Sequence, residues 1–188
     1  LIKRKFNPNL YFSLLLNHTS RLNKLNRRRV YLIVLIILIS IVLASSSIPI
    51  DQSEAKQIMD NLENIIPGDP TTFPIFQNNM QIALLMMVPV LGLIIGPYAL
   101  YNTGLVFSAS GVISGFPGIL MLLIIFIMPF FWLEFLSYAA AITQGLYLIW
   151  AIKKKRLRIE IRNTLRVIGI VAILLFVGAW IEEIFIQL

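Results

Sequence analysis

The chain has 188 residues, of which 58% are hydrophobic and 13% are charged, and its mean hydropathy is +0.83. Soluble domains carry about 25% charged residues, and this chain contains several apolar runs longer than the roughly 18 residues that cross a bilayer. A soluble globular domain is therefore excluded, and the chain is predicted to be an all-α, multi-pass protein of the cell membrane.

The formal charge of +7 is concentrated in two basic segments that lie next to apolar runs. Residues 1–29 carry Lys and Arg but no acidic residue, and KKKRLRIEIR covers residues 153–162. Basic residues in such places indicate the cytoplasmic side and contact with anionic lipid, so nucleic acid is not an expected partner. The residues expected to flank the membrane are Arg27, Arg28, Arg29, Lys153, Lys154, Lys155 and Arg156.

The chain contains no cysteine and one histidine. This composition excludes disulfides, thiol chemistry and metal sites built from Cys or His. No catalytic triad or nucleophile–base arrangement is visible either. We therefore expect neither a cofactor nor an enzymatic activity.

The first part of the chain is predicted to hold one span. Residues 1–29 are expected to form a basic cytoplasmic segment, and residues 6–28 mix apolar and basic side chains as interfacial helices do. The apolar residues 30–50 are predicted to be the first transmembrane helix, which runs outward as a signal anchor rather than as a cleaved signal peptide.

The acidic residues 51–78 are predicted to form a loop outside the cell. Asp51 and Glu54 have the spacing of a capping box, and Pro67-Gly68 would end the helix that follows, so a short amphipathic helix is expected at residues 52–66. Two roles remain open for this helix. Its apolar face packs on the membrane or the helix bundle, or it docks an external partner.

Residues 79–188 are predicted to form a core of four transmembrane helices. The nearly uncharged stretch between the outer loop and the second basic segment is too long for one span, and an odd number of crossings must connect them. We expect three helices, near 79–98, 104–128 and 131–152. A last span at 164–186 gives about five transmembrane helices in all, with the N-terminus in the cytoplasm and the C-terminus outside.

Small residues recur at helical spacing through this core, which predicts close helix–helix packing. The residues concerned are Gly92, Gly96, Gly104, Ser108, Gly111, Gly115, Gly118, Ser137, Ala141 and Gly145. The cluster of Gly, Ser and Pro at 110–118 also fits a broken or re-entrant helix. Such a break is tolerated only where it is buried or lines a cavity, and in transporters it accompanies binding sites.

Glu134 is the single charged residue between positions 79 and 150. It shares a helix face with Ser137 and Gly145, so it is expected to point into the bundle. We predict a polar contact with Asn79, which enters from the same outer side, rather than with Asn102, which is expected at the opposite side. The contact either joins helices or belongs to a proton or substrate site.

Several segments resemble one known family. FPIFQNNMQIALL at residues 73–85 is similar to the F-x-x-N-x-x-x-A segment of the stage II sporulation protein M family, and Asn102-Thr103-Gly104 is similar to its Asn-Gly. Pro129 to Glu134 resembles its Pro-His-Gly-x-x-Glu motif, and AWIEEIFI at 179–186 resembles its closing helix. Phe130-Phe131 stands where the family has His-Gly, which argues against a catalytic His–Glu pair here. The resemblance implies a five-span membrane scaffold or complex subunit.

Two functional hypotheses follow. The first is a non-enzymatic scaffold or accessory subunit of a membrane or cell-envelope complex, whose partners are the lipid bilayer and other membrane subunits or further copies of the chain. The second is a small transporter or channel component that uses the intramembrane carboxylate of Glu134.

Overall fold

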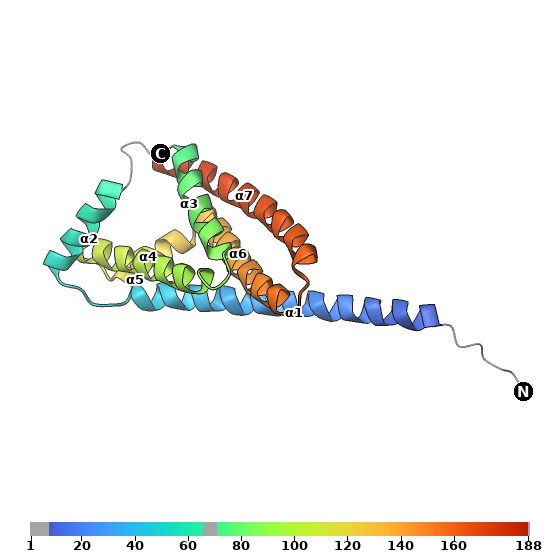
Figure 1. Ribbon diagram of the computed structural model, residues 1–188. Helices are drawn as coiled ribbons and strands as arrows, with labels where there is room; N and C mark the ends of the chain where they lie inside the picture. Colours follow the sequence, from blue (N-terminus) through green and yellow to red (C-terminus); the bar gives the residue numbers. More distant parts are fainter. Residues whose placement is uncertain (1–7, 66–70, 188) are drawn as a thin grey trace, which may run out of the picture.

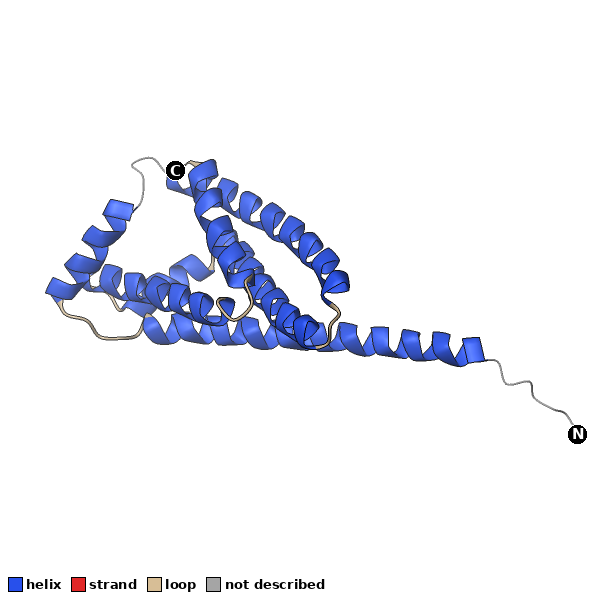
Figure 2. Cartoon of the chain, viewed as in Figure 1, coloured by secondary structure: helices blue, strands red, loops and turns tan. Residues whose placement is uncertain are grey.

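The computed structural model describes residues 8–65 and 71–187, and these residues form α-helices joined by short turns, with no strand among them (Figures 1 and 2). In chain order the helices are α1 (Pro8–Ser45), α2 (Gln52–Ile65), α3 (Thr72–Met87), α4 (Gly92–Ser114), α5 (Gly118–Phe126), α6 (Pro129–Lys153) and α7 (Leu157–Gln187).

Helix α1 is one continuous helix of 38 residues. Its first half projects beyond the bundle in line with the second half (Figure 1), so residues from Pro8 onward continue into the first predicted span without a break. The helix ends at Ser45 rather than at residue 50. There the hydroxyls of Ser45, Ser46 and Ser47 donate to carbonyl oxygens of the preceding turn, which favours termination.

Helix α2 agrees with the helix predicted at 52–66, as far as residue 65. The backbone N–H of Glu54 donates to the Asp51 carboxylate at 2.8 Å, and the Ser53 hydroxyl donates to the same oxygen at 2.7 Å. These two hydrogen bonds, in that order, hold the pKa of Asp51 below its usual value. Ala55 is fully buried and α2 packs against α4, so the apolar face of this helix lies on the bundle.

The span expected at 79–98 is wrong, because the chain turns at residues 88–91. Pro89 has no N–H to donate and disfavours a helical conformation at Val88, whose ψ is 129°. Helix α3 therefore ends at Met87, and it begins at Thr72, inside the loop that was expected at 51–78. Asn102 consequently lies within α4 and not at a turn.

The span expected at 104–128 is also wrong. Helix α4 ends at Ser114, and the next residue, Gly115, caps it with a φ of 75°, which is the left-handed conformation. Pro117 then precedes α5, and the axes of α4 and α5 differ in direction by 117°. The broken or re-entrant alternative noted in the sequence is therefore the one observed.

Helices α1 and α4 run in the same direction. Gly104 of α4 lies against Val42, and the Ser108 hydroxyl, one turn later, donates to the carbonyl oxygen of Ile48 at 2.6 Å. Both chain segments therefore advance together. The two helices lie side by side along the base of Figure 1.

Helices α3 and α6 are also parallel to each other, and α7 runs antiparallel to both. Asn79 of α3 contacts Glu134 of α6, and Met87 of α3 lies beside Gly145 of α6. Residues 154–156 connect α6 to α7, which returns along α6 and packs against α3 (Figure 1). Helix α6 is the central helix of the bundle, with neighbours α1, α3 and α7.

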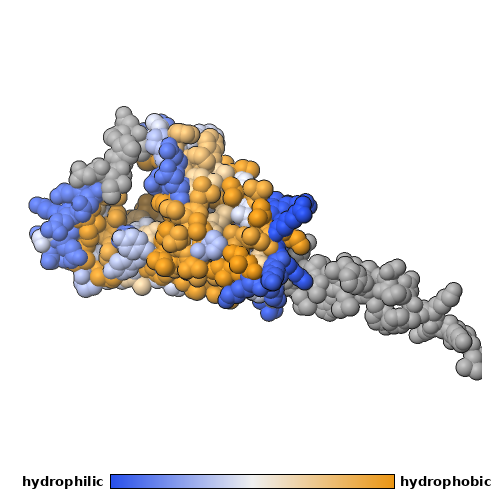
Figure 3. Space-filling model, in the orientation of Figure 1, coloured by the Kyte–Doolittle hydropathy of each residue, from blue (hydrophilic) through white to orange (hydrophobic). Residues whose placement is uncertain are grey.

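Among the described residues, three helices are long and apolar enough to cross a membrane, and a fourth span results if the bent pair α4–α5 counts as one. These three are Arg27–Ser45 of α1, α6 and α7. Helix α3 has 16 residues, which is short for a span. Apolar side chains cover the middle of the visible surface, and polar side chains gather at α2 and at the opposite end (Figure 3).

Candidate functional site

The site is built on the first half of α6. Pro129 occupies the first turn, where its missing N–H costs no hydrogen bond. The indole N–H of Trp132 donates to the carbonyl oxygen of Phe126 at 2.8 Å and ties the start of α6 to the end of α5. Ser137 and Ala141 are fully buried, so this face of α6 packs directly on its neighbours.

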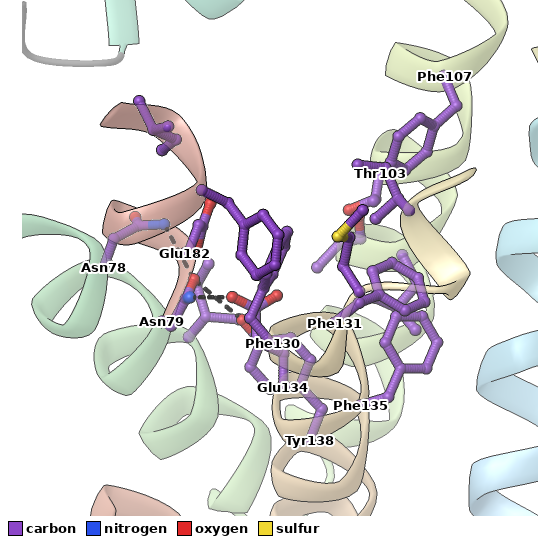
Figure 4. A pocket seen from close by; sticks show the side chains of 17 residues that line it. Asn78, Asn79, Thr103, Phe107, Phe130, Phe131, Glu134, Phe135, Tyr138 and Glu182 are labelled. Atoms are coloured by element: carbon purple, nitrogen blue, oxygen red, sulfur yellow. Dashed lines mark hydrogen bonds between the residues drawn. The ribbon is translucent and has the colours of Figure 1, made fainter. Parts of the chain in front are cut away.

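Glu134 is joined to α3 by a hydrogen-bonded chain, which we call the outer clasp: Asn79, Glu134 and Tyr138. The Asn79 side-chain amide donates to Glu134 Oε1 at 2.5 Å, and the Tyr138 hydroxyl donates to Asn79 Oδ1 at 3.1 Å (Figure 4). Asn79 is 9% exposed and Tyr138 is 6% exposed. The structure thus brings together the two residues that the sequence paired.

Asn102 is not part of this site. It lies on α4, and its neighbour Thr103 is the residue that faces the site. The preference for Asn79 over Asn102 rested on an expected turn near Asn102. That turn is absent. Asn79 is nevertheless the partner of Glu134, because α3 and α6 lie side by side and parallel.

A cavity of about 710 Å³ adjoins the outer clasp. Helices α3, α4, α6 and α7 and the end of α5 line this cavity, which is open on one side. Its polar lining consists of Asn78, Asn79, Thr103, Glu134, Tyr138 and Glu182. Aromatic rings supply much of the remaining wall, namely Phe107, Phe130, Phe131, Phe135 and Phe185 (Figure 4).

Glu182 also lines this cavity, and it was not among the site residues predicted from the sequence. The antiparallel return of α7 along α6 brings it to the cavity that Glu134 lines, although the two residues are 48 positions apart. The available signal was that Glu134 lies near the start of one predicted helix and Glu182 near the end of the next predicted helix. Among the described residues, no three His, Asp or Glu side chains converge as metal ligands.

A second polar group lies toward the other end of α6, and we call it the inner cluster: Arg27, Gln144, Glu160 and Thr164. Arg27 forms a salt bridge with Glu160. The Gln144 amide donates to Glu160 Oε1 at 2.8 Å and to Thr164 Oγ1 at 2.9 Å. The cluster therefore joins α1, α6 and α7. Arg27 was expected only to flank the membrane, and Glu160 was not singled out.

Among the described side chains, the other basic residues that were expected to flank the membrane do not form such a cluster. Their side chains are exposed: Arg28, Arg29, Lys153, Lys154, Lys155 and Arg156. Lys154 Nζ lies 3.8 Å from the centre of the Trp150 ring, so a basic and an aromatic residue pack together at this end of α6. Such pairs are typical of the membrane–water interface.

A third helix-to-helix contact lies at the start of α3. The backbone N–H of Thr72 donates to Glu183 Oε2 at 2.9 Å, and the Thr72 hydroxyl donates to the same oxygen. The carboxylate thereby satisfies an N–H of the first turn of α3 that has no partner within the helix. This contact fixes the start of α3 to the end of α7.

Most of the small residues lie at close contacts between helices, as the sequence predicted. A Cβ added to Gly104 would lie 2.8 Å from the carbonyl oxygen of Val42 on α1, and one added to Gly92 would lie 1.8 Å from that of Met86. Gly96, Ser108, Gly111, Ser137, Ala141 and Gly145 are likewise buried, and Gly118 lies tightly between helices. Gly115 is the exception. It is exposed, has no neighbour within 4 Å, and serves as the C-cap of α4.

Comparison with known proteins identifies the family. No curated protein and no solved structure matches the chain. The model of the family described as SpoIIM, Stage II sporulation protein M, matches residues 29–185, and this range contains the outer clasp, the cavity lining except Ile186, and the inner cluster except Arg27. The resemblance found in the sequence is thereby confirmed, and the chain belongs to the stage II sporulation protein M family of membrane proteins.

Proposed function

We propose that the chain is a non-enzymatic scaffold or accessory subunit of a membrane or cell-envelope complex. The observation that carries this proposal is that most carboxylates of α6 and α7 form hydrogen bonds between helices. Three of the four, Glu134, Glu160 and Glu183, accept hydrogen bonds from another helix. An intramembrane carboxylate is costly, and here the cost is offset by holding a bundle in one arrangement.

The lack of a continuous polar route supports the same proposal. Between Tyr138 in the outer clasp and Thr143 beside the inner cluster, α6 carries only Ala139, Ala140, Ala141 and Ile142. Buried apolar side chains from α1, α3 and α7 pack around this stretch. Glu134 and Gln144 are ten residues apart, which corresponds to about 15 Å along a helix. The two polar groups are therefore separate in the described core.

The proposed subunit crosses the cell membrane five times, with its N-terminus in the cytoplasm. Helices α1, α3, α4, α6 and α7 would be the crossings. The shared direction of α1 with α4, and of α3 with α6, agrees with this alternation, as does the return of α7. Helix α3 would cross at a thin place, because 16 residues extend about 24 Å.

A scaffold needs a surface for its partners, and α2 supplies one outside the membrane. Its apolar face packs on α4, and the side chains of Glu54, Lys56, Gln57 and Asn61 are exposed on the other faces. We propose that a partner subunit contacts this polar face. Partners within the bilayer would contact the exposed apolar side chains of α7.

The experiment is site-specific photocrosslinking in native membranes. A photoreactive residue replaces Gln57 on α2, and a control variant carries it at Ile170, which is 57% exposed on α7. We expect one adduct of defined mass from position 57 and a different pattern from position 170. Absence of any protein adduct from positions 56, 57 and 61 would refute docking on α2.

The second candidate function is a small transporter or channel component. The cavity beside Glu134 and the break between α4 and α5 favour it, because broken helices next to a midplane site are typical of transporters. Flux into vesicles that contain the purified chain, lost in Glu134→Gln while the fold is retained, would support this candidate over the scaffold.

A further inference from the structure

The cavity beside the outer clasp has the size and wall of a ligand site. Its volume of about 710 Å³ lies within the range of roughly 300–1,000 Å³ found for small-molecule pockets. Aromatic rings and a few polar groups converge on it from helices that are distant in the sequence (Figure 4). The scaffold role proposed above does not require a ligand, so it does not explain this cavity.

Acceptor oxygens at this cavity have no partner among the described residues. Glu134 uses Oε1 to accept from Asn79, and no hydrogen bond reaches its second oxygen. No hydrogen bond reaches the carboxylate of Glu182 either, and Glu182 lines the same cavity. Two carboxylates therefore face a mostly apolar space with free acceptor capacity.

The lining offers them no positive charge. None of the lining residues is Lys, Arg or His. Because a carboxylate in apolar surroundings is costly unless it is paired, the missing counter-charge must come from an occupant or from protons. An occupant that supplies this counter-charge in place of protons is a cation.

The aromatic wall selects the kind of cation. Ammonium groups are attracted to the faces of aromatic rings, and an organic body can fill an apolar volume that a hydrated metal ion would leave poorly contacted. Asn78 and Thr103 add neutral polar groups at the edge of the cavity. We propose that the cavity between α3, α4, α6 and α7 binds a small organic ammonium ion, with Glu134 and Glu182 facing the ammonium group and the phenylalanines around its body.

The test is direct binding to the full chain in nanodiscs of zwitterionic lipid, measured by isothermal titration calorimetry. The probe is 2-phenylethylammonium, and its matched controls are the neutral 2-phenylethanol and the anionic phenylacetate. We expect saturable binding of the ammonium ion and at least about tenfold weaker binding of both controls, because a charged hydrogen bond is lost. Equal binding of 2-phenylethanol, or no saturable binding of the ammonium ion, would overturn the proposal.

Variants separate the cavity from partition into lipid. Glu182→Gln leaves the outer clasp intact and should weaken binding about tenfold, whereas Glu183→Gln, at the next position but bonded to Thr72, should bind like the natural chain. Ala99→Phe, which fills the cavity without changing charge, should abolish binding. Unchanged binding in Glu182→Gln and Ala99→Phe would contradict the proposal. Binding without flux would leave the scaffold role intact.

Discussion

Gly118 lies where three segments of the chain meet, so replacing it with alanine should be costly. A Cβ at this position would lie 2.4 Å from Ser108 Cα and 2.6 Å from the carbonyl oxygen of Ser46. Carbon atoms in good contact are about 3.5–4.0 Å apart, so the shortfall exceeds about 1 Å. Both obstructing atoms belong to the backbone and no rotamer change relieves them. Overpacking costs about 1–3 kcal/mol, and we expect Gly118→Ala near the upper end.

Thermal unfolding of the purified chain in mild detergent, followed by circular dichroism, measures this effect. For a chain of this length, 1 kcal/mol corresponds to a Tm shift of about 2–4 °C, so Gly118→Ala should lower Tm by about 6–12 °C. Gly169→Ala is the matched control, because no atom lies within 4 Å of its added Cβ. Its Tm should stay within a few degrees of the natural chain or rise. Equal Tm values for the two variants would refute the close junction at Gly118.

Three further predictions concern the inner cluster, α2 and the topology. Arg27→Ala removes the ion pair of Glu160, whose Gln144 hydrogen bond remains, and should cost about 1.5–2 kcal/mol in the same unfolding assay; Arg28→Ala, at an exposed position, should change stability little. The pKa of Asp51 is lowered, so its capping of α2 is present above its unfolded pKa of about 3.9 and is lost as pH falls through the lower folded pKa. Carboxyl NMR of Asp51 should therefore give a midpoint below the unfolded value, and a midpoint at or above it would contradict the cap. In this cysteine-free chain, single cysteines at Gln57 and Gln187 should react with a membrane-impermeant maleimide on intact cells, whereas cysteines at Arg28 and Lys155 should react only after permeabilisation; reaction of both groups under one condition would exclude five crossings.

Features that depend on local chemistry could be predicted from the sequence. Helix α2 was predicted because Asp51 caps its first turn and Pro67-Gly68 follows it. The face of α6 that carries Glu134 was predicted from the helical period, whereas the choice of Asn79 as its partner rested on expected spans whose boundaries differ from those of α3 and α4. The cap of α2 and the face of α6 did not require knowledge of how distant helices pack.

The helix boundaries in the core were harder to predict, because two prolines with similar surroundings behave differently. Pro89 ends α3, whereas Pro97 lies inside α4. The sequence is apolar on both sides of each proline, so hydropathy does not tell them apart. Helices in lipid tolerate proline when neighbouring groups satisfy the backbone carbonyl that loses its hydrogen bond. The tight contact of Gly92 with Met86 closes the turn at Pro89. Pro89 allows a turn here, but the close approach of the two helices is a tertiary contact that one sequence does not reveal.

The shared cavity of Glu134 and Glu182, and the salt bridge of Arg27 with Glu160, could not be predicted for the same reason. Each pair is set by which helix faces meet after folding. Arg27 resembles its exposed neighbours Arg28 and Arg29 in sequence, and only its position opposite α7 makes it a structural residue.

Whether Glu134 serves as a clasp between α3 and α6 is decided by comparing Glu134→Gln with Glu134→Ala in the complex isolated from native membranes. A glutamine oxygen can still accept from the Asn79 amide, so Glu134→Gln should leave the mass and the thermal stability of the complex unchanged. Glu134→Ala should lower both, because Asn79 loses its acceptor. An intact complex in which Glu134→Gln abolishes activity would contradict the clasp and would assign the function to the titratable proton.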